Sequence, residues 1–121
     1  MKYLLMIYSD EAADARKPAN ELERELGQYF AFSTETQNAG VFVAGEALHP
    51  TATATTVRIR EGQLTTIDGP FAETKEQLGG FYLLDCKNLD EAIQWASKIP
   101  HASQGSIEIR PLIDFGQAAS A

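Results

Sequence analysis

Two segments of this chain are apolar on both faces when read as strands, and this restricts how the chain can fold. Residues 2–8 read KYLLMIY and residues 80–86 read GFYLLDC. Successive side chains of a strand point to opposite faces, so each segment places large apolar groups on both sides. Strands of this kind need cover above and below the sheet.

Two helices are predicted, over residues 20–40 and 88–100. The first has Asn20 as its cap and Gly40 as its terminator. Asn88 with Glu91 forms the capping box of the second, and Pro100 ends it. An apolar stripe at helical spacing runs along the first helix. It comprises Leu22, Leu26, Tyr29, Phe30 and Ser33.

The remaining strands are expected at residues 41–48, 56–60, 63–68 and 106–112. The pair 56–60 and 63–68 reads as a hairpin around Glu61 and Gly62, with Val57 and Ile59 facing inward. Residues 9–19 are expected to be a polar connection. The order strand, helix, strand, hairpin, strand, helix, strand predicts a ferredoxin-like α+β fold with an added hairpin, covering residues 1–112. Residues 113–121 are expected to form a tail.

Two helices can cover only one face of such a sheet. Something must cover the other face, and the simplest candidate is a second copy of the chain. The sequence therefore predicts a homodimer that encloses a barrel-like interior, with a ligand pocket where the two surfaces meet.

Charge and composition narrow the partners. The 121 residues carry a formal net charge of -7, which disfavours direct binding to nucleic acid. No segment approaches the roughly 20 apolar residues of a membrane span, and the short apolar start does not resemble a signal peptide. A cytoplasmic protein is expected. The single cysteine, Cys86, allows no intrachain disulfide and is expected to be a buried, inert thiol.

The segment DGPFAETKEQLGGF, residues 68–81, concentrates turn residues and charge. Gly69 and Pro70 are strong turn formers and place Asp68 at a strand end. Asp68 can act as a proton acceptor, or it can simply accept hydrogen bonds from the turn. Phe71 is a buried anchor or a surface on which a ligand stacks.

The second half of that segment allows both a purely structural and a functional interpretation. Glu73, Lys75 and Glu76 form a solvated charged patch, or Lys75 grips an anionic ligand. Gly79 and Gly80 mark a backbone bend or a close approach by another group.

A second candidate site is AGEALHP, residues 44–50. Histidine titrates near neutral pH, so His49 with Asp68 or Glu46 can form a general acid–base pair. A surface loop histidine is the alternative. The other histidine, His101, is expected in a polar loop. Two histidines and scattered acids make a poor metal site, so no metal or cofactor is predicted.

Ser9 and Asp10 end the first strand. They can border a pocket, but a turn that connects the strand to a helix explains them equally well.

Several segments together resemble the YCII-related family, in its DGPF-domain branch. They are MKYLLMIYSDE, AGEAL, TATATTVRIREG, DGPFAETKEQLGGFYLLD and GSIEIRP. The resemblance implies a ferredoxin-like fold that dimerises as an α-β barrel, association with extracytoplasmic-function sigma factors, and an Asp and a His proposed as catalytic. It also implies that one relative takes part in dehydrochlorination of a chlorinated hydroxyquinone-type compound.

The resemblance carries over to particular residues. The name-giving motif is matched by Asp68, Gly69, Pro70 and Phe71. The extension of this motif is matched by residues Glu73 to Glu76 and Gly79 to Phe81. Glu46 matches the AGE element. The histidine that shorter relatives have after their first strand is missing from residues 9–19. His49 is not a clear equivalent of it.

Three functions remain open. The first is an enzyme that moves a proton on, or eliminates a group from, an unknown small organic molecule, with Asp68 as acid or base and His49 or Lys75 assisting. Burial would have to raise the pKa of Asp68 for this role. The second is a non-catalytic ligand-binding or regulatory module that works with a sigma factor. The third is a stable dimer whose motif serves only folding.

Overall fold

The computed structural model describes residues 1–116. The chain forms six strands and three α-helices over these residues, with two short 3₁₀ helices, η1 and η2. The elements are β1 (Lys2–Ser9), α1 (Glu11–Ala15), α2 (Ala19–Asn38), β2 (Phe42–Ala47), η1 (Thr51–Thr53), β3 (Thr55–Arg60), β4 (Gln63–Asp68), β5 (Gln77–Asp85), α3 (Leu89–Ala96), η2 (Pro100–Ser103) and β6 (Ser106–Pro111). No helix among the described residues is long and apolar enough to cross a membrane.

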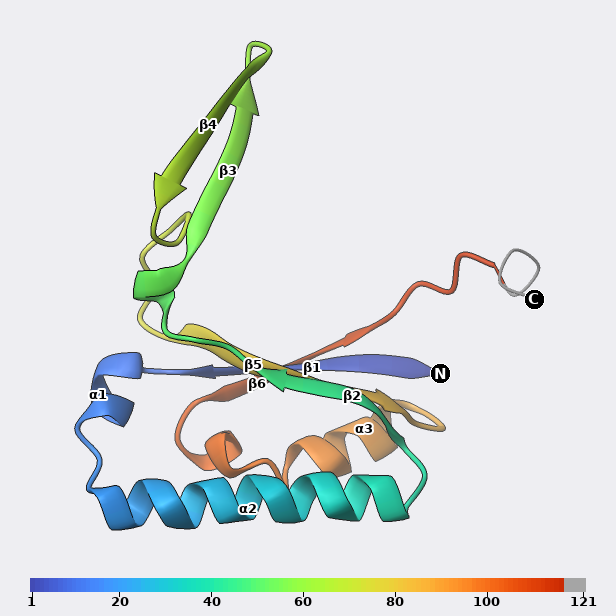
Figure 1. The fold of residues 1–121 in the computed structure, drawn as a ribbon. Coiled ribbons are helices and arrows are strands. Elements are labelled where there is room, and N and C mark those ends of the chain that lie inside the picture. Colours follow the sequence, from blue (N-terminus) through green and yellow to red (C-terminus); the bar gives the residue numbers. More distant parts are fainter. Residues whose placement is uncertain (117–121) are drawn as a thin grey trace.

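The main sheet has the strand order β2-β5-β1-β6, and all its neighbours are antiparallel. Helices α2 and α3 lie against one face, while the β3–β4 hairpin rises from the other (Figure 1). With the hairpin set aside, this is the strand order of a ferredoxin-like α+β fold, as the sequence predicted. The two apolar segments are its central strands, β1 and β5.

The core lies between the sheet and the helices. Leu5 and Leu84 are fully buried, and Phe32 of α2 packs on Tyr82 with ring centroids 4.8 Å apart. Every second residue of β1, from Tyr3 to Ser9, is buried on this face. The alternation follows from the period of two in a strand whose one side meets helices.

The predicted helix ends are confirmed in part. Gly40 has the positive φ of 76° expected of a terminator after α2, but α3 ends at Ala96, and Pro100 begins η2 instead of ending that helix. Asn88 caps α3 through a bond from the Glu91 amide, as expected. Asn20 does not cap α2, because Pro18 occupies that position and pre-sets the extended backbone there. The supposed polar connection contains helix α1, which Asp10 caps by accepting hydrogen bonds from the amides of Ala12 and Ala13.

The hairpin forms where it was predicted. Glu61 and Gly62 have φ of 52° and 77°, the positive values that a tight two-residue hairpin turn needs. The inward orientation of Val57 and Ile59 is wrong for the single chain, since they are 59% and 65% exposed. The hairpin forms a separate two-stranded sheet with no helix against it.

The predicted stripe on α2 is also partly wrong. Leu22, Leu26 and Phe30 are 42%, 55% and 66% exposed, and the buried residues of α2 are Phe32 and Thr36. The face that meets the sheet is therefore rotated from the one that apolar spacing indicated.

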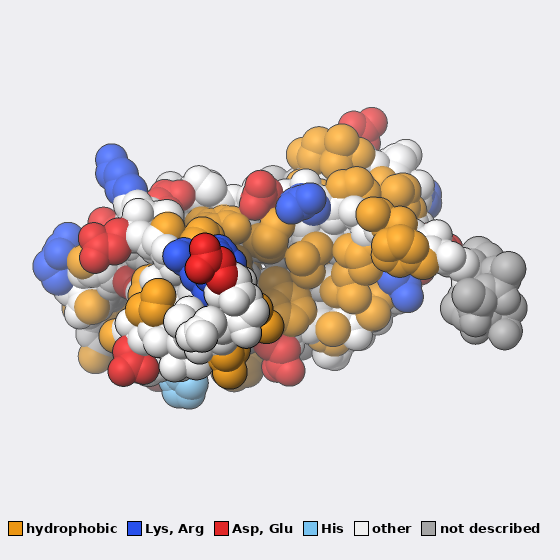
Figure 2. Space-filling view, turned by 90° about the horizontal axis from the view of Figure 1, so that it is seen from above, with side chains coloured by type: hydrophobic (Ala, Val, Ile, Leu, Met, Phe, Trp, Pro, Cys, Tyr) orange, Lys and Arg blue, Asp and Glu red, His pale blue; other side chains and the backbone are white. Residues whose placement is uncertain are grey.

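The face of the sheet opposite the helices carries apolar side chains that are only half-buried by the rest of the described chain. Figure 2 shows hydrophobic groups gathered over it and beside the hairpin. We call this the open face; alternation along the strands assigns to it Leu4, Met6, Phe81 and Leu83. Residues 112–116 have no helix or strand, and 117–121, the rest of the expected tail, lie outside the described residues.

Candidate functional site

A cavity of about 630 Å³ lies on the helix-covered side of the sheet. Helix α2 forms one wall, with Leu26, Tyr29 and Phe30. Strands β2 and β5 form the facing wall, and α1 and η2 contribute Asp14 and His101. The sequence placed a pocket against the open face instead. A pocket between two subunits there stays a prediction.

Glycine in β5 lets the strands come close enough to form this wall. Gly80 is buried, and a Cβ atom there would lie 2.8 Å from the carbonyl oxygen of Glu46 on β2. Gly45 has a similar role, because a Cβ atom there would lie 2.6 Å from the Tyr82 ring. A side chain at either position would push against its neighbours.

His101 is buried in η2, so its assignment to a polar loop is wrong. Its Nδ1 lies 2.5 Å from the Tyr29 hydroxyl. On the other side of the ring, Nε2 lies 3.4 Å from Asp14 and 3.5 Å from Glu25. Both ring nitrogens are therefore held by groups from elements distant in the sequence.

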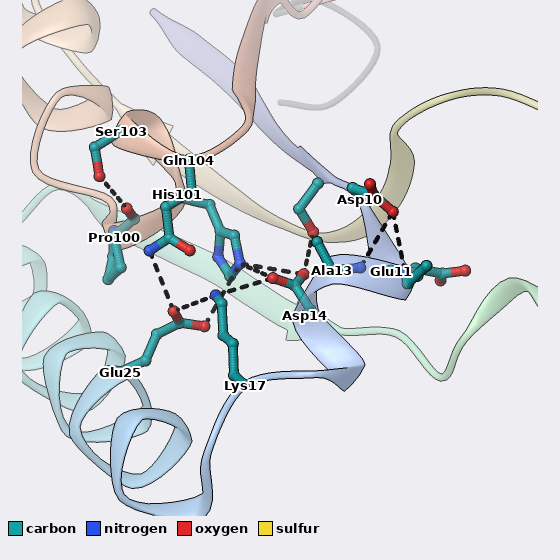
Figure 3. Close-up of polar contacts among 12 residues, drawn as sticks. Asp10, Glu11, Ala13, Asp14, Lys17, Glu25, Pro100, His101, Ser103 and Gln104 are labelled. Atoms are coloured by element: carbon teal, nitrogen blue, oxygen red, sulfur yellow. Dashed lines mark hydrogen bonds and ion pairs between the residues drawn. The ribbon is translucent and has the colours of Figure 1, made fainter.

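Asp14 and Glu25 are joined by a lysine (Figure 3). Lys17 Nζ lies 2.9 Å from Asp14 Oδ1 and 2.8 Å from Glu25 Oε2, with its side chain only 11% exposed. Ser9 donates a 2.6 Å hydrogen bond to the other Asp14 oxygen. We call these six residues the relay network: Ser9, Asp14, Lys17, Glu25, Tyr29 and His101.

These contacts fix the charge states of Asp14, Lys17 and Tyr29. Burial alone would raise the pKa of Asp14, but the hydrogen bonds from Ser9 and Lys17 outweigh it and lower that pKa. Burial would lower the pKa of Lys17, and its bonds to Glu25 and Asp14 raise it instead. Burial, followed by the charge of Glu25, raises the pKa of Tyr29 far above its ordinary value. Asp14 is thus an anion, Lys17 a cation and Tyr29 a neutral phenol at neutral pH.

The network accommodates the imidazole tautomer that carries its proton on Nε2. A neutral Tyr29 hydroxyl has a proton to donate to Nδ1, and the Nε2 proton then faces the carboxylates. Tyr29 and His101 both line the cavity. A molecule in the cavity can therefore reach an uninterrupted chain from Tyr29 through His101 to Asp14.

Helix α1 also connects the cavity to the base of the hairpin. The Glu11 carboxylate accepts a 3.0 Å bond from the Thr51 amide and a 2.6 Å bond from its hydroxyl. The Glu11 amide in turn donates to the Gln77 side chain on β5. Glu11 lines the cavity, and Thr51 belongs to η1, just before β3.

The predicted site residues divide into two groups. Glu46 and Gly80 line the cavity. The others are absent from its wall and lie in the loop after β2, at the end of β4 or in the segment that follows it; they are His49, Asp68, Gly69, Pro70, Phe71, Glu73 and Lys75. The structure therefore does not bring Asp68 or His49 to the relay network.

The segment after β4 has the turn chemistry that its sequence indicates. Gly69 has φ of 106°, a value that favours glycine, and its amide donates a 2.6 Å bond to the Ala54 carbonyl. Its own carbonyl accepts from Thr56. Asp68 pairs with Thr55 across the hairpin and is exposed, as is Phe71 at 76%. A buried anchor role for Phe71 is wrong within one chain.

Four residues of the network were not singled out from the sequence: Asp14, Lys17, Glu25 and Tyr29. They lie in what looked like a linker or in a helix rich in charge, and no short motif links them to His101. The run KIPHA offered one signal, because proline favours the first turn of a helix, and Pro100 begins η2 with His101 directly after it. Among residues 1–116, no three His, Cys, Asp or Glu side chains are arranged so that they could hold a metal ion.

Cys86 takes no part in this site. It is buried, and burial with the nearby Glu91 and Asp85 carboxylates raises its pKa. It is therefore a neutral thiol at physiological pH, as the sequence predicted.

Comparison with known proteins shows which family this sequence matches. The profile described as "YCII-related domain" matches residues 1–116. An uncharacterized protein of Rhizobium meliloti (strain 1021), R00369, is 42% identical over 114 residues, which cover 93% of this chain and 92% of that protein.

Proposed function

The chain belongs to the YCII-related domain family, and we propose that it transfers a proton on a small organic molecule held in the cavity beside the relay network. The observation that carries the proposal is the chain of contacts from Tyr29 through His101 to Asp14 at the cavity wall. It replaces the pairing of Asp68 with His49, because neither residue lines that wall.

The proton moves in a balanced relay. The substrate gives a proton to the Tyr29 oxygen while the Tyr29 proton passes to Nδ1 of His101. The bond broken in the substrate leaves its electron pair there, and the imidazole becomes an imidazolium. Because the high pKa of Tyr29 disfavours a free phenolate, the two transfers occur together. The return of the proton to another atom of the substrate restores the resting state.

The carboxylates of Asp14 and Glu25 lie next to the ring nitrogen of His101 that faces away from Tyr29. Two carboxylates and one ammonium give a charge of -1 when His101 is neutral. Protonation of His101 brings this sum to zero. Opposite charges a few ångströms away stabilise a cation, so Asp14 and Glu25 support the charged intermediate state.

Hydrogen exchange offers a test without knowledge of the natural substrate. Cyclic ketones such as indan-1-one, incubated in D₂O, lose the NMR signal of protons next to the carbonyl as deuterium enters. The wild-type protein should accelerate this exchange by about 100-fold over buffer, the lower range for a positioned acid–base group. Tyr29→Phe and His101→Asn should return the rate to that of buffer.

A matched pair of carboxyl variants locates the effect. Asp14→Asn should slow exchange by at least about tenfold, because it removes the charge beside the imidazolium. Asp68→Asn makes the same chemical change at an exposed position and should leave the rate within about twofold. Equal rates for wild type and His101→Asn, or loss of exchange in Asp68→Asn alone, would reject the relay.

The family resemblance implied a homodimer, and the open face supports it as a proposal. Ile59 and Leu64 are partners across the hairpin and are 65% and 66% exposed. A two-stranded hairpin is marginally stable alone in water. Packing of this hairpin and the open face against a second copy would cover both. The sigma-factor association stays a prediction.

Analytical ultracentrifugation tests the dimer. The wild-type protein should sediment as a dimer at micromolar concentration, and Ile59→Lys should shift it to monomer while leaving the circular dichroism spectrum unchanged. Leu22→Lys, an equally apolar exposed position on α2, should stay dimeric. A wild-type monomer at about 100 µM would contradict the proposal, since that concentration exceeds the Kd expected for an interface of standard size.

A further inference from the structure

The cavity wall has an uneven charge. The ionisable side chains that line it are the carboxylates of Glu11 and Asp14, together with the phenols of Tyr29 and Tyr82 and the imidazole of His101. Glu46 borders the cavity as well, but its pairing with Phe81 places its carboxylate on the open face. No lysine or arginine of the described residues is part of the wall. Lys17 lies nearby, but its ammonium is engaged by two carboxylates at 2.8 and 2.9 Å. An anion entering this space meets negative charge without a free cation.

The rest of the wall is apolar and largely aromatic. Phe42 and Tyr82 lie on the sheet side with ring centroids 6.5 Å apart. Leu26 and Phe30, one turn apart on α2, line the cavity from the helix side and are 55% and 66% exposed. Their exposure within the wall means that a ligand would remove apolar surface from water.

From these two features we infer that the cavity accepts an uncharged molecule containing a ring and rejects analogues that carry a carboxylate or phosphate. The ring lies among Phe30, Phe42 and Tyr82, and the polar group reaches the end where Tyr29 and His101 lie. A volume of about 630 Å³ falls within the range of pockets for small organic ligands. The inference rests on the proposed function only in treating this ligand as the substrate.

Benzamide and benzoate provide matched probes, since they share a ring and a similar size and differ in charge at pH 7. Binding is followed by the shifts of the Gly45, Gly79 and Gly80 amide signals in ¹H–¹⁵N spectra. Benzamide should bind with a Kd at least about tenfold lower than that of benzoate, a ratio that corresponds to about 1.4 kcal/mol. The ratio of the two Kd values should fall as salt is added, because salt screens part of the repulsion between benzoate and the carboxylates of the wall.

A cation placed in the wall should reverse the preference. Leu26→Lys adds an ammonium at an exposed lining position and should improve benzoate relative to benzamide by at least about tenfold. Leu22→Lys adds the same charge one turn earlier on α2, at a residue that does not line the cavity. It should leave the ratio within about twofold of wild type, which separates a local charge from the change in net charge.

Several results would overturn the inference. They are benzoate binding as tightly as benzamide, no glycine shift with either probe up to about 20 mM, and an unchanged ratio in Leu26→Lys. Loss of the wild-type oligomer in Leu26→Lys would assign this surface to a subunit contact instead. Selective benzamide binding without ketone exchange would reject the proton relay and leave the ligand class intact, so the two proposals fail separately.

Discussion

The segment from Asp68 to Glu76 and the relay network distribute charge in opposite ways. The segment places three acids and a lysine within nine consecutive residues, yet Asp68, Glu73 and Lys75 are exposed and none of them lines the cavity. The network draws its six residues from β1, α1, the turn after it, α2 and η2. Charges close in sequence remain in water here, while charges far apart are assembled by the fold into a buried group.

The largest expected difference in stability between the two regions comes from a lysine. Lys17→Met should lower the free energy of unfolding by about 3 kcal/mol, because two partly buried carboxylates lose the cation between them. Lys75→Met makes the same change on an exposed segment and should stay within about 0.5 kcal/mol of wild type. Urea denaturation of both variants measures the contrast. Similar losses of unfolding free energy for the two variants would show that the segment from Asp68 to Glu76 stabilises the fold through contacts other than those described.

A smaller difference is expected between two glycines. Gly80→Ala places a Cβ atom 2.8 Å from the Glu46 carbonyl oxygen, which should cost about 2 kcal/mol by displacing β2. Gly69→Ala meets no atom within 4 Å but keeps φ of 106°, so it should cost about 1 kcal/mol from backbone strain. Thermal and urea unfolding rank the two. A larger loss for Gly69→Ala would indicate that the motif turn has tighter surroundings than this cavity wall.

The smallest effect depends on pH. Because the folded-state pKa of Asp14 is lowered, its ionised form favours the folded state. That stability is present above the unfolded value of about 3.9 and is lost as the pH falls through the lower folded value. The free energy of unfolding of the wild type should exceed that of Asp14→Asn by about 1 kcal/mol at pH 7. This difference in stability, the gap, should close in that acid range. Ser9→Ala should narrow the gap, whereas a gap that stays constant down to pH 2 would contradict this origin.

The fold was predictable because its signals are local. Alternation in β1 and β5, the Asn88 cap and the turn at Glu61 and Gly62 each depend on a few neighbouring residues. Helix α1 was missed because only five residues form it, and its Asp10 cap looked like the end of a strand. The stripe on α2 failed because Leu26 and Phe30 line a cavity instead of the core, so apolar spacing indicated the wrong face.

The site was less predictable because it depends on tertiary contacts. Glu46 and Gly80 were singled out from short segments of the sequence, and both line the cavity. His101 lies 87 residues from Asp14 in sequence, and the β1–β6 pairing helps to bring η2 beside α1. A motif search finds residues that are close in sequence, so it selected Asp68 and His49 and had no access to this pair.

The bonds between Glu11 and Thr51 have a consequence for communication within the molecule. One carboxylate both borders the ligand space and holds the last turn before the hairpin begins. A ligand that displaced Glu11 would release η1, and the β3–β4 hairpin would then be freer to rotate about its base. Binding in the cavity would then change the mobility of the β3–β4 hairpin, whose turn lies far from the bound molecule.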